Sequence, residues 1–161
     1  MDRATEFIFC FDKFNDIVIF VDVVIYPHNG TSIESVEEAL PFIKQLDQPN
    51  LFLSLHLCHE ISAGNGDRLV EVSKKAKPYL KYVSISGSNF KAGGPKNPKY
   101  RTNVIQPLYE GDFPLEKFVE ALKVINYSGE MFLHTWGIKE SMFIHMPKSY
   151  KTWQNLLETE N

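Results

Sequence analysis

Leucine side chains alternate with other residues over positions 51–57, and this pattern predicts a β-strand with one apolar face. The other face carries Phe52, Ser54 and His56, so it changes from apolar to polar toward the carboxyl end. In parallel sheets packed against helices, ligands bind beyond the carboxyl ends of the strands. The pattern therefore predicts a site at the end of this strand, where His56 and His59 have the spacing HxxH.

The same strand-then-helix pattern recurs along the chain. Strands are expected over 17–26, 51–57, 82–86 and 131–135. Thr31 and Glu34 have the form of a capping box for a helix that ends before Pro49. Further helices are expected before Pro78, after Pro114 and after a helix-poor stretch around Pro147. Their apolar faces are Leu69, Val72 and Ala76; Phe118, Leu122 and Ile125; and Tyr150, Trp153 and Leu157.

Four such units in succession imply parallel strands joined by helical crossovers. The two candidate architectures are a doubly wound open sheet and part of a (β/α)8 barrel, which needs roughly 250 residues when complete. Polar Ser54, Ser84 and Ser86 lie opposite the aliphatic strand faces, which favours a barrel interior. The predicted fold is an α/β half-barrel, a partial TIM barrel of about four βα units, with residues 1–161 forming a single incomplete domain.

The first residues predict an amphipathic helix over 3–15, because Phe7, Phe11 and Phe14 have helical spacing. A strand over 7–11 is the competing interpretation. The concave face of a half-barrel would carry residues such as Val24, Phe52 and Phe132, which a complete barrel hides. Either the N-terminal aromatic helix or a second copy of the chain, in a homodimer, is expected to cover that face.

Composition and charge limit the classes of binding partner and the cellular compartment that are expected. The chain has 161 residues, 43% of them hydrophobic, with a net charge of −3 and a pI near 5.9, which disfavours nucleic-acid and anionic-membrane surfaces. Two cysteines, Cys10 and Cys58, do not make a disulfide framework, so a reducing cytoplasm is expected. No apolar run approaches the roughly 18 residues of a membrane span.

A long connection over 87–112 is rich in Gly, Pro and Asn and carries Lys91, Lys96, Lys99 and Arg101. Long loops of this kind in compact domains are usually either lids over an active site or disordered excursions. Its cations could hold a phosphate, or they could form a solvated charge run.

With these units placed, the sequence resembles the C-terminal half of the xylose isomerase-like TIM barrels, the superfamily of sugar isomerases, sugar epimerases and endonuclease IV. The matching pieces run in order over 17–158, and residues 1–16 match nothing. They are 25–30 (IYPHNG), 49–50 (PN), 57–60 (LCHE), 83–87 (VSISG), 105–113 (IQPLYEGDF) and 127–134 (YSGEMFLH).

The resemblance implies a divalent metal held by Glu, Asp, His and Glu at four strand ends. At those positions this chain has Tyr26, His56, Ser84 or Ser86, and His134. His59, which follows the second ligand position by three residues, is retained. The carboxylate site of the family is therefore not expected here.

Four of the five histidines, His28, His56, His59 and His134, lie at predicted strand ends. His56, His59 and His134 could bind one transition metal ion such as Zn, Mn or Co, whereas Mg²⁺ is disfavoured because it needs oxygen ligands. His28 and His134 could instead act as acid and base. The alternative is that all four are hydrogen-bonded rim residues.

The positions of other side chains along the predicted elements indicate their expected roles. The expected substrate contacts are Ser84, Ser86, Asn89, Lys91 and Trp136, and Trp136 could stack on a sugar ring or pack in the core. Strand alternation points Cys58 away from His59 and predicts a buried thiol rather than a nucleophile. Glu60, Glu110 and Asp112 are expected to cap helices or face water, and His145 has no assigned role.

The predicted function is that of a sugar or sugar-phosphate isomerase or epimerase, which transfers a proton next to a carbonyl group. The alternative is a non-catalytic carbohydrate-binding or interaction module on a degenerate barrel, and the sequence leaves open whether the chain is an enzyme. An endonuclease activity is disfavoured by the acidic balance and the missing carboxylates.

Overall fold

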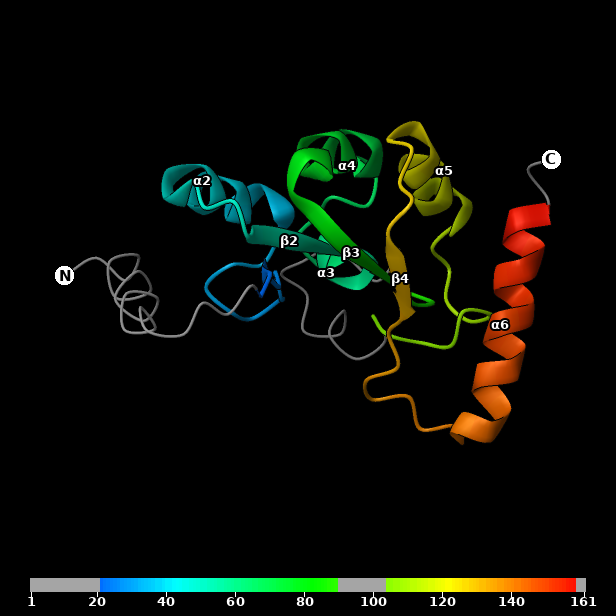
Figure 1. Ribbon diagram of the computed structural model, residues 1–161. Coiled ribbons are helices and arrows are strands. Elements are labelled where there is room, and N and C mark those ends of the chain that lie inside the picture. Colours follow the sequence, from blue (N-terminus) through cyan, green and yellow to red (C-terminus); the bar gives the residue numbers. More distant parts are fainter. Residues whose placement is uncertain (1–20, 90–103, 159–161) are drawn as a thin grey trace.

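The computed structural model describes residues 21–89 and 104–158 and contains one sheet of four parallel strands (Figure 1). The strands are β1 (Val23–Ile25), β2 (Leu51–His56), β3 (Leu80–Ile85) and β4 (Glu130–Leu133). They lie in the order β1-β2-β3-β4, so their order in space is their order along the chain. A barrel has this order, whereas a doubly wound sheet reverses it at a switch point. The fold is α/β and corresponds to part of a TIM barrel, as predicted.

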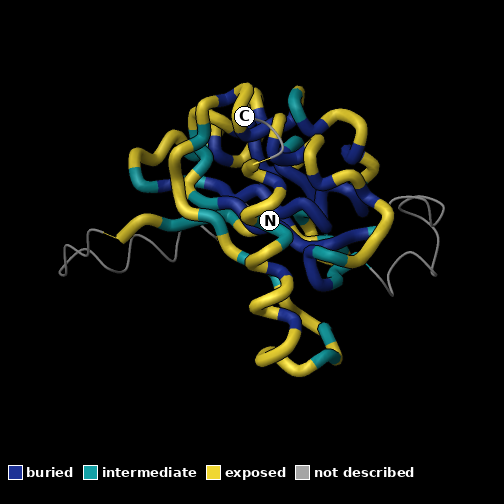
Figure 2. The backbone as a smooth tube through the Cα atoms, turned by 90° about the vertical axis from the view of Figure 1, so that its right-hand side faces the viewer, coloured by how far each residue is buried: buried dark blue, intermediate teal, exposed yellow. Residues whose placement is uncertain are grey.

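Helices cover one face of this sheet. They are α2 (Val36–Leu46), α4 (Leu69–Ala76) and α5 (Glu116–Val124), whereas the last helix, α6 (Met142–Glu158), stands to the side beyond β4 (Figure 1). The aliphatic face of β2 packs beneath them, and Leu53 and Leu55 are fully buried together with Phe118 of α5. Of the strands, β2 is mostly buried, whereas β4 alternates between exposed and intermediate positions. Figure 2 shows a buried centre, from which the largely exposed start of α6 projects. No helix in the described ranges is long and apolar enough to cross a membrane.

Most predicted elements are present, but two predictions about where helices begin are wrong. The cap of α2 is Ser35, whose Oγ accepts a hydrogen bond from the backbone amide of Glu38 at 3.4 Å. Thr31 does not cap this helix, because its hydroxyl donates to the carbonyl of His28 at 2.8 Å and closes the preceding turn. Pro147 does not interrupt the last helix either. It lies inside α6. Proline has no amide proton, so the carbonyl of Phe143, four residues earlier, receives no helical hydrogen bond. Phe143 is 85% exposed, and water can supply that bond.

The first predicted strand is observed at Val23–Ile25, and the predicted helix over 3–15 lies outside the described residues.

The ends of the long connection are joined by a bridge between Gly87 and Gln106, whose backbone groups exchange hydrogen bonds of 2.8 and 2.9 Å. A Cβ atom at Gly87 would lie 2.1 Å from the carbonyl oxygen of Pro107, so only glycine allows this approach. Lys91 and the other loop cations lie outside the described residues.

Glu60 ties the short helix α3 (Leu57–Ser62), which follows β2 directly, to the start of α2. Its carboxylate is buried and accepts hydrogen bonds of 2.7 Å from the backbone amide of Val36 and from Nδ2 of Asn65. Burial raises the pKa of Glu60 to about 7, against the lowering effect of these two hydrogen bonds. The prediction that this acid caps a helix is confirmed, and the cap comes from 24 residues away.

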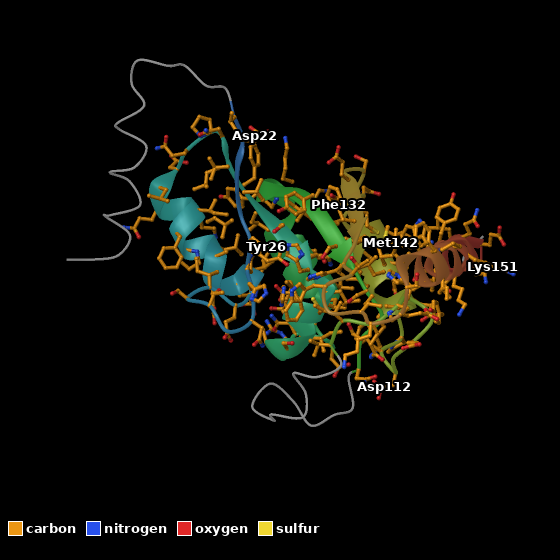
Figure 3. All side chains as sticks on the ribbon, turned by 90° about the horizontal axis from the view of Figure 1, so that it is seen from below. Asp22, Tyr26, Asp112, Phe132, Met142 and Lys151 are labelled. Carbon is orange, nitrogen blue, oxygen red and sulfur yellow. The ribbon has the colours of Figure 1, made fainter. Side chains whose placement is uncertain are left out.

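The face of the sheet opposite the helices is aromatic and partly open to solvent. Figure 3 looks onto this face, where Tyr26 and Phe132 are labelled. Tyr26 is 40% and Phe132 48% exposed, and the Phe132 ring meets Tyr82 edge-on with centroids 5.4 Å apart. Tyr82 and Phe132 are diagonal neighbours across the two strands, since Tyr82 of β3 pairs with Glu130 and Ser84 pairs with Phe132 of β4.

The Glu60 cap makes a stability prediction. We expect Glu60→Ala to lower the free energy of unfolding by about 3 kcal/mol, because it leaves two buried donors without an acceptor. Glu116→Ala, which removes an exposed acid from the first turn of α5, is the matched control and should cost only a few tenths of a kcal/mol. Urea titrations of both variants measure the difference, and equal losses would contradict the anchoring role.

The exposed aromatic face of the sheet leads to a prediction about the oligomeric state of the chain. We expect the chain to be a dimer in light scattering, with Phe132→Glu shifting it to monomer, because a charge on this face opposes its burial against a second copy. Val124→Glu, on the outward side of α5 and 45% exposed in the parent, should leave the mass unchanged. A parent chain that is monomeric, melts cooperatively and binds no ANS would show that the face needs no partner.

Candidate functional site

Four histidines come together at the carboxyl ends of the strands. His28 follows β1, His56 ends β2, His59 lies in α3, and His134 follows β4. Ring centroids are 4.2 Å apart for His28 and His59, and 5.7 Å apart for His59 and each of His56 and His134. The convergence that the sequence predicted for these residues is present in the structure, and Tyr26 lies among them.

His56 forms a buried bridge between neighbouring strands. Its Nδ1 lies 2.5 Å from Oγ of Ser84 and its Nε2 lies 2.7 Å from Oγ of Ser54. Ser54 donates its own proton to the carbonyl of Ile25, so it accepts from Nε2–H, and Ser84 donates to Nδ1. Both ring nitrogens are therefore satisfied in the neutral imidazole. Burial, and then the nearby histidines, lower the pKa of His56 to about 3.

His59 is held by Tyr26 on one side and the loop after β1 on the other. The backbone amide of Asn29 donates to its Nδ1 at 3.4 Å, which places the ring proton on Nε2, 3.2 Å from the hydroxyl of Tyr26. Burial lowers the pKa of His59 to about 3 and raises that of Tyr26 to about 12. Tyr26 therefore keeps its proton at neutral pH, accepts from His59 and can donate to a ligand.

Cys58 lies on the same side as His59 and faces His134, contrary to the prediction that strand alternation points Cys58 away from His59. Its Sγ lies 3.4 Å from Nδ1 of His134. The alternation fails because the chain becomes helical at Leu57, so Cys58 belongs to the first turn of α3 rather than to the strand. The thiol is buried, as predicted, and burial raises its pKa to about 12. A protonated thiol donates to Nδ1, which leaves the ring proton of His134 on Nε2.

His28 has the opposite tautomer. Its Nδ1 lies 2.8 Å from the carbonyl oxygen of Asn29, which can only accept, so the proton is on Nδ1 and Nε2 presents a lone pair. His28 is exposed, whereas His134 is partly buried, and burial, followed by the electrostatic effect of neighbouring His28, lowers the pKa of His134. The cluster thus contains a proton acceptor at His28 and a proton donor at His134.

The residues predicted to contact substrate have unequal access. Ser84 and Ser86 are both buried; Ser84 bonds to His56, and Ser86 lies 3.4 Å from the hydroxyl of Ser88. Asn89 is partly exposed, and Lys91 lies outside the described residues. Trp136 is 78% exposed, which leaves its ring available for stacking rather than in the core.

A carboxylate-bound divalent ion does not fit this cluster. Within the described part of the chain, the side chains that could share a metal are Cys58, His59 and His134, with ligand atoms within 4.8 Å of one another and no carboxylate among them. The buried acid nearest in sequence, Glu60, has both oxygens engaged by Val36 and Asn65. Hard, oxygen-preferring ions therefore lack their usual ligands here.

Sequence reasoning missed two members of the site. The family resemblance assigns Tyr26 no role, because the family has an acid at this position. In the structure its ring lies 3.9 Å from that of His56. Its place at the end of β1 was a usable signal. Cys58 was set aside because the leucine alternation continues through Leu57, and nothing in that alternation shows where the helix begins.

Comparison with known proteins gives a family match over almost the whole chain. A family model described as xylose isomerase-like TIM barrel matches residues 11–158. The search of curated proteins found no match.

Solved structures share the fold at low sequence identity. The probable 3-DHS dehydratase AsbF from Bacillus anthracis is 15% identical, with a TM-score of 0.68 over 94% of this chain and 55% of its own. A D-tagatose 3-epimerase-like protein is 19% identical, with a TM-score of 0.66 over 97% and 53%. D-psicose 3-epimerase from Clostridium cellulolyticum H10 is 20% identical, with a TM-score of 0.53 over 86% and 42%. The chain thus spans about half the length of these structures, and the likeness concerns the fold.

The neutral histidines predict a loss of stability in acid. His56 takes a proton at about pH 6.5 when unfolded but only at about pH 3 when folded, so the unfolded state binds more protons between these values. We expect stability measured in EDTA to fall as pH drops below 6.5, with His56 alone contributing about 2 kcal/mol of loss by pH 5. His56→Gln should remove that part of the slope. Parallel profiles of parent and variant from pH 7 to 5 would contradict the buried neutral bridge.

Proposed function

Because the chain belongs to the xylose isomerase-like TIM barrel family, we propose that it binds a sugar or sugar phosphate and transfers a proton next to the sugar's carbonyl group. The observation that carries this proposal is the pair of complementary tautomers at the carboxyl ends of the strands, with an acceptor at His28 and a donor at His134. Isomerisation and epimerisation of sugars need one group to take a proton from carbon and one to supply a proton to oxygen.

His28 is the proposed base. Its Nε2 takes the proton from the carbon beside the carbonyl, and the electrons of that C–H bond form the double bond of an enediol. The carbonyl of Asn29 accepts from Nδ1–H and stabilises the imidazolium that results. Exposure of His28 allows it to meet a ligand entering from solvent.

His134 is the proposed acid. Its Nε2–H gives a proton to the carbonyl oxygen as the enediol forms, while Cys58 remains hydrogen-bonded at Nδ1. Tyr26 adds a second donor toward developing negative charge on oxygen, since its proton is not needed by His59. The imidazolium of His28 then returns its proton to the same carbon or to the neighbouring one, and an enediol hydroxyl returns its proton to His134 as the carbonyl re-forms, which restores both histidines.

His56 and His59 are proposed to position these groups. His56 joins Ser54 and Ser84 across two strands and fixes the floor of the site, and the ring of His59 lies 4.2 Å from that of His28 and 5.7 Å from that of His134. Asn89, Lys91 and Trp136 are proposed to contact the substrate, with Trp136 stacking on a sugar ring. The buried Ser84 and Ser86 would act through His56 and Ser88 rather than by direct contact.

A second function is favoured by one observation. The positions that hold carboxylates in the family carry Tyr26, His56 and His134, and His56 is fully hydrogen-bonded. A non-catalytic carbohydrate-binding or interaction module on the same scaffold would retain binding without proton transfer. Such a module would be stabilised by sugars but would exchange no carbon-bound proton.

The test is solvent deuterium exchange into a panel of ketoses and their phosphates, followed by NMR. We expect exchange at the carbon next to the carbonyl, and a fall of at least about 100-fold in His28→Asn and in His134→Asn. Asparagine suits both positions, because its amide can donate to the Asn29 carbonyl at position 28 and its oxygen can accept from Cys58 at position 134. Binding should persist in both variants.

His145→Gln is the matched control, since it removes the one described histidine outside the cluster, in α6. Its exchange rate should equal that of the parent, with thermal melts confirming that all three variants are folded. Absence of exchange with every sugar, together with sugar-induced stabilisation, would replace the enzymatic proposal with the binding module.

A further inference from the structure

Three potential metal ligands meet at the junction of α3 and β4. Cys58 and His59 are adjacent in the first turn of α3, and His134 follows β4. Their ligand atoms all lie within 4.8 Å of one another, in a buried to partly buried setting. The mechanism proposed above uses His134 Nε2 but leaves the thiol without a chemical role.

The separation of two of these atoms already fits a tetrahedral metal. Zinc bonds of about 2.3 Å to sulfur and 2.0–2.1 Å to nitrogen, at a tetrahedral angle, place the two ligand atoms roughly 3.5 Å apart. Sγ of Cys58 and Nδ1 of His134 are 3.4 Å apart. This pair is therefore spaced as two ligands of one ion.

His59 is the third member of the set, and its ligand atom lies within 4.8 Å of the other two. Its contacts with Tyr26 and the Asn29 amide are 3.2 and 3.4 Å long, so neither holds the ring tightly. An ion at Nδ1 would take the place of the Asn29 donor and would keep Nε2–H bonded to the Tyr26 hydroxyl. Outer partners of this kind orient metal-binding imidazoles.

We propose that Cys58, His59 and His134 form a zinc site with three protein ligands and an open fourth position. A thiolate and two imidazoles are soft to intermediate ligands, which select zinc over manganese or magnesium. On binding, the S–H bond of Cys58 breaks, its proton passes to solvent, and the sulfur forms the bond to the ion. Three protein ligands with an open position are typical of catalytic rather than structural zinc.

This ligand set differs from His56, His59 and His134, which the sequence predicted. His56 has both nitrogens engaged by Ser54 and Ser84, so it could bind an ion only by breaking two buried hydrogen bonds. Cys58 takes its place in the proposed site. The inference is independent of the proposed sugar chemistry, because its test measures metal binding alone.

The test uses the full chain, stripped with EDTA and then dialysed against Zn²⁺ or Co²⁺ as the only added probe. We expect close to one zinc per chain by elemental analysis. The cobalt form should show the near-ultraviolet charge-transfer absorption of a thiolate bond to the metal. Cys58→Ser should abolish that absorption and weaken zinc binding at least 100-fold in competition with a chromophoric chelator, and His134→Gln should weaken binding comparably.

Two matched controls separate this site from its rivals. Cys10→Ser removes the other cysteine of the chain, and His56→Gln removes the histidine that we exclude as a ligand. Both should retain one zinc and the cobalt absorption. Melting curves in EDTA establish that each variant is folded, and Cys58→Ala replaces Cys58→Ser if the serine variant is not.

Three outcomes would overturn the proposal. One is a parent chain that holds no stoichiometric zinc after dialysis. Another is full zinc and cobalt binding by the folded Cys58 variant. The third is loss of metal in His56→Gln while Cys58→Ser retains it. The last result would restore the all-histidine set, and activity in the sugar assay has no bearing on any of the three.

Discussion

The two-residue period of β2 is the constraint on which the site depends. Leu53 and Leu55 are fully buried beneath the helices, and that burial fixes which face every other side chain of the strand occupies. A slip of one residue would place leucine on the open face and His56 in the core. The apolar packing of one face thus determines the chemistry of the other.

Desolvation is the second organising effect. Burial keeps His56 and His59 neutral and Cys58 protonated, and it keeps the Tyr26 hydroxyl a donor. Each of these states removes a charge that the protein interior would not tolerate. The same neutral groups are suited to exchanging protons or to binding a cation, because imidazole offers a lone pair in its uncharged form.

Much of the fold was predictable because it follows from local periodicity. The faces of α4 and α5, the order of the strands and the meeting of the four histidines all follow from regular spacing and from the parallel arrangement. Cys58 was misplaced because the change from strand to helix at Leu57 is not visible in the leucine pattern. The bonds of Tyr26 and Glu60 join residues more than 20 positions apart, and such pairings depend on packing that a single sequence does not show.

The bridge between Gly87 and Gln106 has a consequence for how such a scaffold can diversify. The bridge fastens both ends of the connection next to β3, and just inside it the buried hydroxyl of Ser88 donates to the carbonyl of Val104. The entropic cost of closing a loop grows only slowly with its length. Insertions and deletions between residues 89 and 104 are therefore expected to cost the sheet little, because the connection is already closed on the sheet side of them.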